Sequence, residues 1–262
     1  MSLVVDGRDV RRVSRIQEQW VQRFKPTLPP RPSDANKNFQ ARIVECVLEN
    51  KTNSDYEPGS PSYDPALNGP FSVKDVKLAR DKSELNKSPS DDDVLNEMLK
   101  RGGQTLLLSL TIFINLLWIL EVTPLIWKTV VMKPMYKKGS LLDPLNYRPI
   151  ALLSNLFKLY ERVIDKRIRA VILIALEQCG FRPGFSTEVA LLRLSLLIQH
   201  QSASGGELWL AFLDLEQAFE RAWRMGILYQ LWAAGVRGKC WRVITEMLTG
   251  ISAFVARTTG TL

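Results

Sequence analysis

The sequence predicts a helix-rich α+β fold, and three observations support this. Several stretches of ten or more residues repeat apolar side chains at helical spacing. Three shorter runs, at 127–135, 208–213 and 252–257, have the apolar and β-branched character of strands. The chain has 262 residues, 46% hydrophobic and 24% charged, which is the composition of a globular protein with a proper core.

The first 70 residues differ in composition from the rest. Residues 1–27 have the pattern of a basic amphipathic helix, with apolar positions at Ile16, Trp20, Val21 and Phe24. The following stretch is rich in Pro, Ser, Asn and Asp, which is typical of a partly disordered linker, and a short helical piece near 43–48 interrupts it. We therefore expect four parts: an N-terminal basic helix (1–27), a linker (28–70), a helical region (71–200) and a C-terminal region (201–262).

Three helices are predicted before the first strand. Ser72 is expected to cap a helix over 73–82, and Ser90 or Asp91 to begin another that ends near Lys100. The third covers 105–120, which are 16 residues without a charge. A membrane span needs about 20 apolar residues, so we predict a buried core helix, with a span as the alternative.

The first strand is expected to stop at Pro134, and the chain to turn over 136–139. Ser154 then begins a strongly amphipathic helix, with Lys and Arg side chains on or beside the face opposite its apolar stripe. The stripe consists of Leu156, Leu159, Tyr160, Val163, Ile164, Ile168 and Val171.

The remaining elements follow from turn residues and helical spacing. Pro183 and Gly184 set a loop over 180–186. We expect, in order, a helix from Thr187 to about His200, a turn at Gly205-Gly206, the strand 208–213, helices near 221–233 and 239–248, and a last strand at 252–257.

The charge of the chain is concentrated in one stretch. The net charge is +8, from 35 basic and 27 acidic residues, and residues 128–169 contain ten basic and three acidic side chains. A concentrated basic stretch favours a polyanionic partner, nucleic acid first and an anionic membrane second, with a solvated helix face as the alternative.

Several kinds of chemistry lack the residues they need. The three cysteines, Cys46, Cys179 and Cys240, are widely scattered, which argues against a disulfide framework and against a zinc site. His200 is the single histidine, so it is the only residue that could serve as the base of a Ser-His or Cys-His catalytic dyad. No Gly-rich phosphate-binding motif occurs.

Asp214 is the most informative single residue. It directly follows the apolar run 208–213, which predicts a short strand buried on both faces. A carboxylate at the end of a dry strand needs a cation or hydrogen-bond donors. Two interpretations stay open on this stretch alone: a metal ligand, or a cap for the following helix with Gln217.

Four sequence blocks occur in a fixed order: MKPMYKKG at 132–139, NYRPIALL at 146–153, QCGFRPGFST at 178–187 and FLDLEQAF at 212–219. In this order and spacing they resemble the reverse transcriptase domain of non-LTR (LINE-type) retrotransposons, over about residues 71–262. The resemblance implies a right-hand polymerase, with fingers in the helical region 71–200 and a partial palm in 201–262.

The resemblance also implies an activity and its site. RNA-directed DNA polymerases of this family extend a DNA primer on an RNA template with deoxynucleotide triphosphates, using two Mg²⁺ ions. Asp214 matches the first metal-binding, catalytic aspartate, and the backbone carbonyl of Leu215 matches a further ligand. Phe219 matches the aromatic residue beneath the incoming sugar.

Basic and loop residues match the remaining parts of that site. Lys137 or Lys138, with Arg148, match fingers residues that neutralise the triphosphate. The residues that match the template-side loop are Gln178, Gly180, Phe181, Arg182 and Ser186. The helix 155–169 is a candidate for phosphate contacts without sequence preference. Surface salt bridges are the alternative for Arg148 and Arg182.

The chain departs from the family pattern at several points. Residues 88–93 stand where a Gly-Pro-Asp-Gly-like turn is expected, Phe185 where a basic residue is usual, and Glu220 where an aspartate is usual. The other metal carboxylates and the thumb are expected beyond Leu262. We therefore expect this chain by itself to be inactive as a polymerase and poorly soluble.

Two other functions are alternatives to a polymerase domain. The first is a non-catalytic nucleic-acid-binding remnant that uses the basic stretch 128–169, and the second is a helical interaction module. No signal peptide pattern occurs. We expect an intracellular protein, cytoplasmic or nuclear, with no membrane partner. No obligate protein partner can be inferred.

Overall fold

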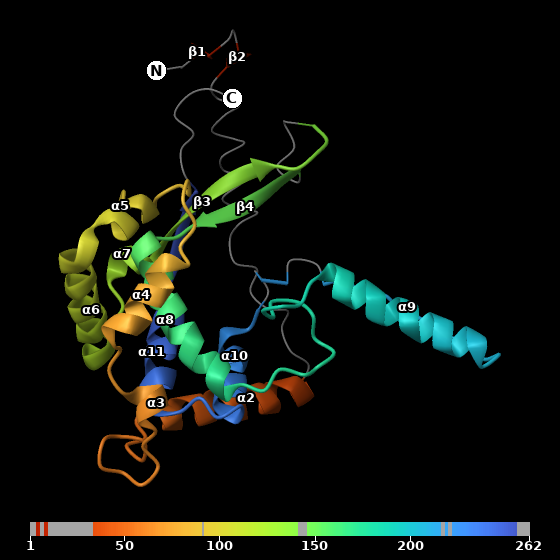
Figure 1. The fold of residues 1–262 in the computed structure, drawn as a ribbon, viewed down its shortest axis with the longest axis horizontal. Coiled ribbons are helices and arrows are strands. Elements are labelled where there is room, and N and C mark those ends of the chain that lie inside the picture. Colours follow the sequence, from red (N-terminus) through yellow and green to blue (C-terminus); the bar gives the residue numbers. More distant parts are fainter. Residues whose placement is uncertain are drawn as a thin grey trace.

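The helix that Ser154 begins lies at the centre of the fold in the computed structural model (Figure 1). This helix, α8 (Asn155–Val171), buries Leu159, Tyr160, Val163 and Ile164 almost completely. The structure describes residues 4–5, 8–9, 34–90, 92–140, 146–215, 218–219 and 222–255. Within them, the predicted mixture of many helices and a small sheet is confirmed.

Helices make up most of the described chain. The other helices are α2 (Asp34–Lys51), α3 (Pro65–Asn68), α4 (Val73–Asp81), α5 (Asn96–Arg101), α6 (Gly103–Leu120), α7 (Leu125–Lys128), α9 (Thr187–Ala203), α10 (Arg224–Ala233) and α11 (Gly238–Leu248). α3 and α4 pack on α8, and buried residues of α6 and α11 belong to the same core. The aromatic ring of Trp127 packs on both Phe157 and Tyr160 of α8.

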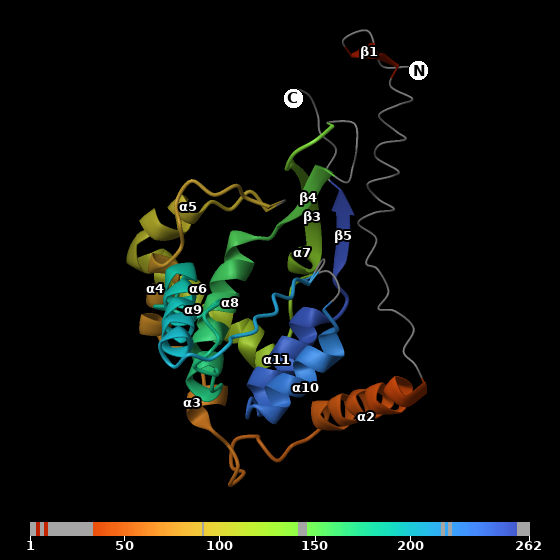
Figure 2. The same ribbon diagram turned by 90° about the vertical axis from the view of Figure 1, so that its right-hand side faces the viewer.

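A three-stranded sheet stands at one end of this helical body (Figures 1 and 2). Its order is β4 (Tyr147–Leu152), β3 (Thr129–Tyr136), β5 (Ser252–Val255); β3 is antiparallel to β4 and parallel to β5. Two further strands, β1 (Val4–Val5) and β2 (Arg8–Asp9), form a separate pair.

The prediction that Pro134 ends the first strand was wrong. β3 continues to Tyr136, and Pro134 lies directly opposite Pro149 of β4. The Lys137 N–H donates to the Asn146 carbonyl at 2.7 Å, and the alternation of an antiparallel ladder then makes the proline pair a non-hydrogen-bonded one. Neither missing N–H is therefore needed between these two strands, and β5 pairs with β3 only up to Met132.

Helix starts with a side-chain cap were predicted best. Ser72 caps α4 in a reciprocal capping box with Asp75, and Ser154 caps α8. By contrast, α5 begins at Asn96 and not at Ser90 or Asp91. A turn closed by the Asp93 N–H and the Ser90 carbonyl, with Asp93 at a φ of 52°, occupies the expected start.

The N-terminal part of the chain differs from the prediction in two ways. The short helical piece expected near 43–48 is the 18-residue helix α2, which packs against α10. The expected helix over 1–27 was wrong for Val4–Val5 and Arg8–Asp9, which are strands. Its apolar positions Ile16, Trp20, Val21 and Phe24 lie outside the described residues.

The long apolar helix α6 is buried on one face only. Leu107, Ile114 and Trp118 lie in the core, whereas Ile112 is 70% exposed. The predicted core helix is therefore confirmed for that face alone. Among the described residues, α6 is the helix long and apolar enough to cross a membrane, but core helices meet the same criteria, so this is weak evidence for a span.

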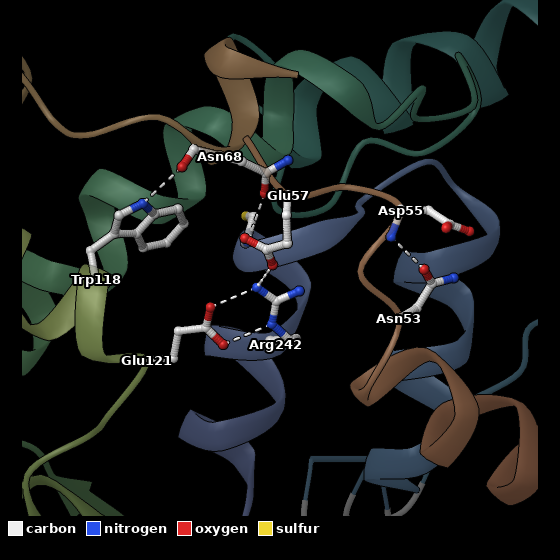
Figure 3. Close-up of polar contacts among 8 residues, drawn as sticks. Asn53, Asp55, Glu57, Asn68, Trp118, Glu121 and Arg242 are labelled. Carbon is white, nitrogen blue, oxygen red and sulfur yellow. Dashed lines mark hydrogen bonds and ion pairs between the residues drawn. The ribbon is translucent and has the colours of Figure 1, made fainter. Parts of the chain in front are cut away.

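A polar network joins three segments that are distant in the sequence (Figure 3). The Arg242 guanidinium of α11 donates to Glu121, at 2.8 and 2.6 Å, and to Glu57. Nearby, the Trp118 indole donates to the Asn68 carbonyl at 3.1 Å. These contacts tie together the loop before α3, the end of α6, and α11.

Candidate nucleotide and template site

The β3–β4 hairpin carries three of the predicted site residues. Lys137 and Lys138 directly follow β3, and Arg148 on β4 pairs with Met135. Because the ladder continues through the Lys137–Asn146 hydrogen bond, the backbone positions of these three residues are neighbours at the end of the hairpin.

The three hairpin cations are available for an external partner. Lys137, Lys138 and Arg148 are exposed, and none of their side chains pairs with another described residue. On the same hairpin, the rings of Tyr136 on β3 and Tyr147 on β4 pack edge to face, with their centroids 5.6 Å apart. This contact stabilises the pairing of the two strands. The end of the hairpin therefore presents exposed positive charge.

The loop over 175–186 carries the residues predicted to contact the template. Phe181 adopts the left-handed conformation, with a φ of 57°. The loop is held by hydrogen bonds to its own carbonyls: Arg169 donates to Phe181 at 3.3 Å, Arg182 to Ala175 at 3.0 Å, and Gln178 to Gly180 at 3.2 Å. The Ser186 hydroxyl bonds to the Glu188 carboxylate at the start of α9.

One aromatic contact brings two of the predicted groups together. The rings of Phe181 and Phe219 meet edge to face at 6.1 Å, although both side chains are about four-fifths exposed, at 83% and 79%. This contact joins the loop to the segment that carries Asp214 and Leu215. Neither of these residues forms a side-chain contact with the hairpin cations in the described structure.

The predicted strand 208–213 was wrong for this structure. Residues 206–215 have no regular secondary structure, and Trp209 and Leu213 are 88% and 94% exposed. An apolar strand needs a hydrogen-bonded neighbour and cover on its faces. In the described sheet, β3 takes β4 and β5 as neighbours, and no described residue pairs with 208–213.

The alternative interpretation of Asp214 as a helix cap was also wrong. Among the described residues, the next helix is α10, which begins at Arg224, and its N-cap is Trp223, without a side-chain hydrogen bond. Asp214 is exposed and has no hydrogen bond or ion pair with the described residues. Its carboxylate is therefore free for an external partner.

The basic helix α8 uses most of its cations inside the protein. Arg162 donates to Ser83 at 2.8 Å, Lys166 pairs with Asp75 at 2.7 Å, and Arg169 pairs with Asp165 at 2.6 Å. Arg167 donates to the carbonyls of the segment before α4. Burial, and the charge of Arg162, lower the pKa of Lys158. These contacts favour the structural interpretation of this helix over phosphate binding.

The described residues lack the donor set of a two-metal site. Two Mg²⁺ ions need several carboxylate oxygens in one place. Among the described residues, no group of three or more His, Cys, Asp or Glu side chains is placed to hold a metal ion. Asp214 alone does not fit two Mg²⁺ ions, and no catalytic step through metal follows from these residues.

Sequence reasoning missed the contribution of Arg193 to this region. Arg193 of α9 donates to the Leu176 carbonyl and lies 5.2 Å from the Phe185 ring centroid. Arg182 also stacks on that ring, at 4.2 Å. A single charge within the apolar run 189–198 was the signal that would have drawn attention to Arg193.

The end of the hairpin, the loop and the segment that carries Asp214 lie in a part of the chain that is similar to reverse transcriptases. Residues 135–261 match the family described as reverse transcriptase (RNA-dependent DNA polymerase). The predicted resemblance is thereby confirmed for the part of the chain that contains the hairpin end, the loop and Asp214.

The individual proteins similar to this chain are RNA-directed DNA polymerases of mobile elements. The chain is 32% identical over 164 residues to the probable RNA-directed DNA polymerase from transposon BS of Drosophila melanogaster, and 31% identical over 163 residues to that from its transposon X-element. It is 30% identical over 168 residues to the RNA-directed DNA polymerase from the mobile element jockey of the same species. These alignments cover 60–61% of the chain but only 18% of each relative.

The chain therefore contains a region similar to the LINE-type reverse transcriptases, and it spans about a fifth of the length of the curated relatives it matches.

Proposed function

We propose that this chain supplies the fingers and part of the palm of an RNA-directed DNA polymerase that copies RNA into DNA for a LINE-type retrotransposon. Its substrates in the whole enzyme are deoxynucleotide triphosphates, with an RNA template and a DNA primer. The observation that carries the proposal is the β3–β4 hairpin, at whose end Lys137, Lys138 and Arg148 are exposed and have no side-chain partner among the described residues.

The residues have separate roles in this proposal. The hairpin cations hold the triphosphate, whose charge grows at the leaving group during transfer. Phe219 lies beneath the incoming sugar, and Asp214, with the Leu215 carbonyl, supplies ligands for divalent metal. The loop residues Gln178, Gly180, Phe181, Arg182 and Ser186 contact the template. The remaining metal ligands have to come from residues other than those described here.

A non-catalytic nucleic-acid-binding role remains the second candidate. Since α8 uses its cations within the protein, the hairpin and not α8 supports such binding. Salt-sensitive RNA binding that survives Asp214→Ala would favour this candidate over a polymerase.

Nucleotide binding by the hairpin tests the leading proposal. Replacing Lys137, Lys138 and Arg148 together by Gln should lower the affinity for a fluorescent deoxynucleotide triphosphate about tenfold or more, since three charge-assisted contacts are lost. The measurement is fluorescence anisotropy on the full chain. The matched control replaces Lys74, Lys77 and Lys82, three exposed lysines on and after α4, by Gln. An equal loss in that control would reduce the effect to net charge and contradict the proposal.

A further inference from the structure

The loop that ends at α9 contains a tight turn with a defined side-chain consequence. The Phe185 N–H donates to the Arg182 carbonyl at 3.2 Å, and Gly184 has a φ of 78°. Pro at the second position and a left-handed Gly at the third are the pattern of a type II turn. This turn brings its two end residues together, so the Arg182 guanidinium lies 4.2 Å from the centroid of the Phe185 ring.

A second guanidinium reaches the same ring from α9. Arg193 lies 5.2 Å from the Phe185 centroid, donates to the Leu176 carbonyl and contacts the Cys179 Sγ at 3.7 Å. It therefore fixes the ring and the opposite side of the loop to one helix. Arginine over an aromatic face is attracted by the ring quadrupole.

One N–H group of the Arg182 guanidinium is hydrogen-bonded within the protein, and the others remain available. Its Nη1 donates to the Ala175 carbonyl at 3.0 Å, and its other N–H groups have no partner among the described residues. A guanidinium carries five N–H donors, so several stay available for a phosphate. The stack on Phe185 keeps these donors in one place.

We propose that Phe185 and Arg193 are positioning residues that hold the Arg182 guanidinium ready for a template phosphate. The proposal rests on the proposed function, in which Arg182 contacts the template. It also gives Phe185 a role at the position where the family usually has a basic residue: an aromatic face that orients a neighbouring arginine replaces a second charge.

Phe185, Arg182 and Arg193 can be replaced without removing side chains from the hydrophobic core. α9 buries none of its residues, and Phe185, Arg182 and Arg193 lie outside the hydrophobic core. Phe185→Leu keeps an apolar side chain but removes the aromatic face, and Phe185→Tyr restores that face. Arg182→Gln removes the proposed phosphate contact itself, and Arg193→Gln removes the second guanidinium.

Two measurements on the full chain separate the possible outcomes. One is hydrogen exchange of the backbone amides of 176–186, and the other is the affinity for a single-stranded RNA oligonucleotide. We expect Phe185→Leu and Arg193→Gln to speed the exchange and to weaken RNA binding, each roughly threefold to tenfold. Phe185→Tyr should match the parent in both.

Failure of the positioning role and failure of the proposed function give different results. If Arg182→Gln weakens RNA binding but Phe185→Leu does not, the positioning role is overturned and the proposed function stands. If Arg182→Gln leaves RNA binding unchanged, the template role of Arg182 fails, and this inference fails with it. A Phe185→Tyr variant that behaves like Phe185→Leu would also overturn the role of the aromatic face.

Discussion

The Arg167 side chain shows why a count of basic residues predicts partners poorly. Its guanidinium lies 3.7 Å from the Phe71 ring centroid and donates to the carbonyls of Leu67, Gly69 and Pro70. Planar stacking with several directed N–H donors is what arginine offers and lysine does not. From the sequence, Arg167 is a candidate for binding nucleic acid. In the fold, its guanidinium instead binds the carbonyls of the segment between α3 and α4.

Glu161 of α8 is an ionisable side chain placed among apolar ones. It lines a groove of about 420 Å³ between β4, α8 and α11, among side chains such as Phe157 and Met247. Burial raises the pKa of Glu161 to about 7, although the charges of Lys158 and Arg162 act against this rise. Folding therefore favours the protonated form of this carboxyl.

A pH dependence of stability follows from that pKa. A group whose pKa is raised by folding adds stability below its unfolded value, here 4.5, and this contribution is lost as the pH rises through 7. We expect the free energy of unfolding to fall by roughly 1–3 kcal/mol between pH 5 and 7.5 on account of Glu161. Glu161→Gln should remove this part of the fall and be more stable than the parent at pH 7.5. Urea unfolding at both pH values measures it.

The control for this prediction is Glu177→Gln, because Glu177 is an exposed glutamate in the loop after α8. That variant should lose stability with rising pH as the parent does. A Glu161→Gln protein that still loses the same amount between the two pH values would contradict the assignment.

At the scale of elements, helix starts depend on single side chains. The Ser154 Oγ accepts from the N–H groups of Leu156 and Phe157, at 3.1 and 3.3 Å, and donates to the Asp92 carboxylate. Ser154→Ala leaves these donors and this acceptor without a partner, so we expect a loss of about 1–2 kcal/mol in the free energy of unfolding. Chemical denaturation measures it, with Ser202→Ala on the exposed end of α9 as the control. Equal stability of both variants would exclude this cap as a significant contribution.

Elements with a local cause were predictable from the sequence, and elements with a distant cause were not. The helices α4, α8 and α11 were predicted because their caps or apolar stripes lie within their own residues. Residues 208–213 failed because a strand exists only with a neighbour, and no local pattern supplies one. β3 runs past Pro134 for a related reason, since its partner Pro149 lies 15 positions away in the sequence.

The candidate site divides in the same way. The hairpin cations and the loop were predictable as motifs, and the ladder and the Phe181–Phe219 contact bring parts of them together. The Arg182–Phe185–Arg193 stack was not predictable, because it depends on how α9 leaves the loop. Motifs indicate which residues take part, but tertiary packing decides which of them are free to bind.

For the whole molecule, the distribution of apolar surface matters more than the net charge. The residues of α9 at 189–198 are apolar nearly all round, a pattern typical of a buried helix, yet α9 projects from the body (Figure 1). Leu192 and Leu196, one turn apart on this helix, are both more than half exposed. The exposed side chains of 208–215 add to this surface.

We therefore expect the purified chain to associate, because contiguous exposed apolar surface of this kind is removed from water by contact between copies. Light scattering after size-exclusion chromatography should give a mass above that of one chain, rising with concentration. Leu192→Glu together with Leu196→Glu should shift the protein toward the monomer, since charged side chains oppose burial of this face. The control, Gln199→Glu with Gln201→Glu, adds the same charge to the same helix without removing apolar surface. If the control dissociates the protein as well, charge repulsion and not the leucine surface governs association, and a monomeric parent would contradict the prediction outright.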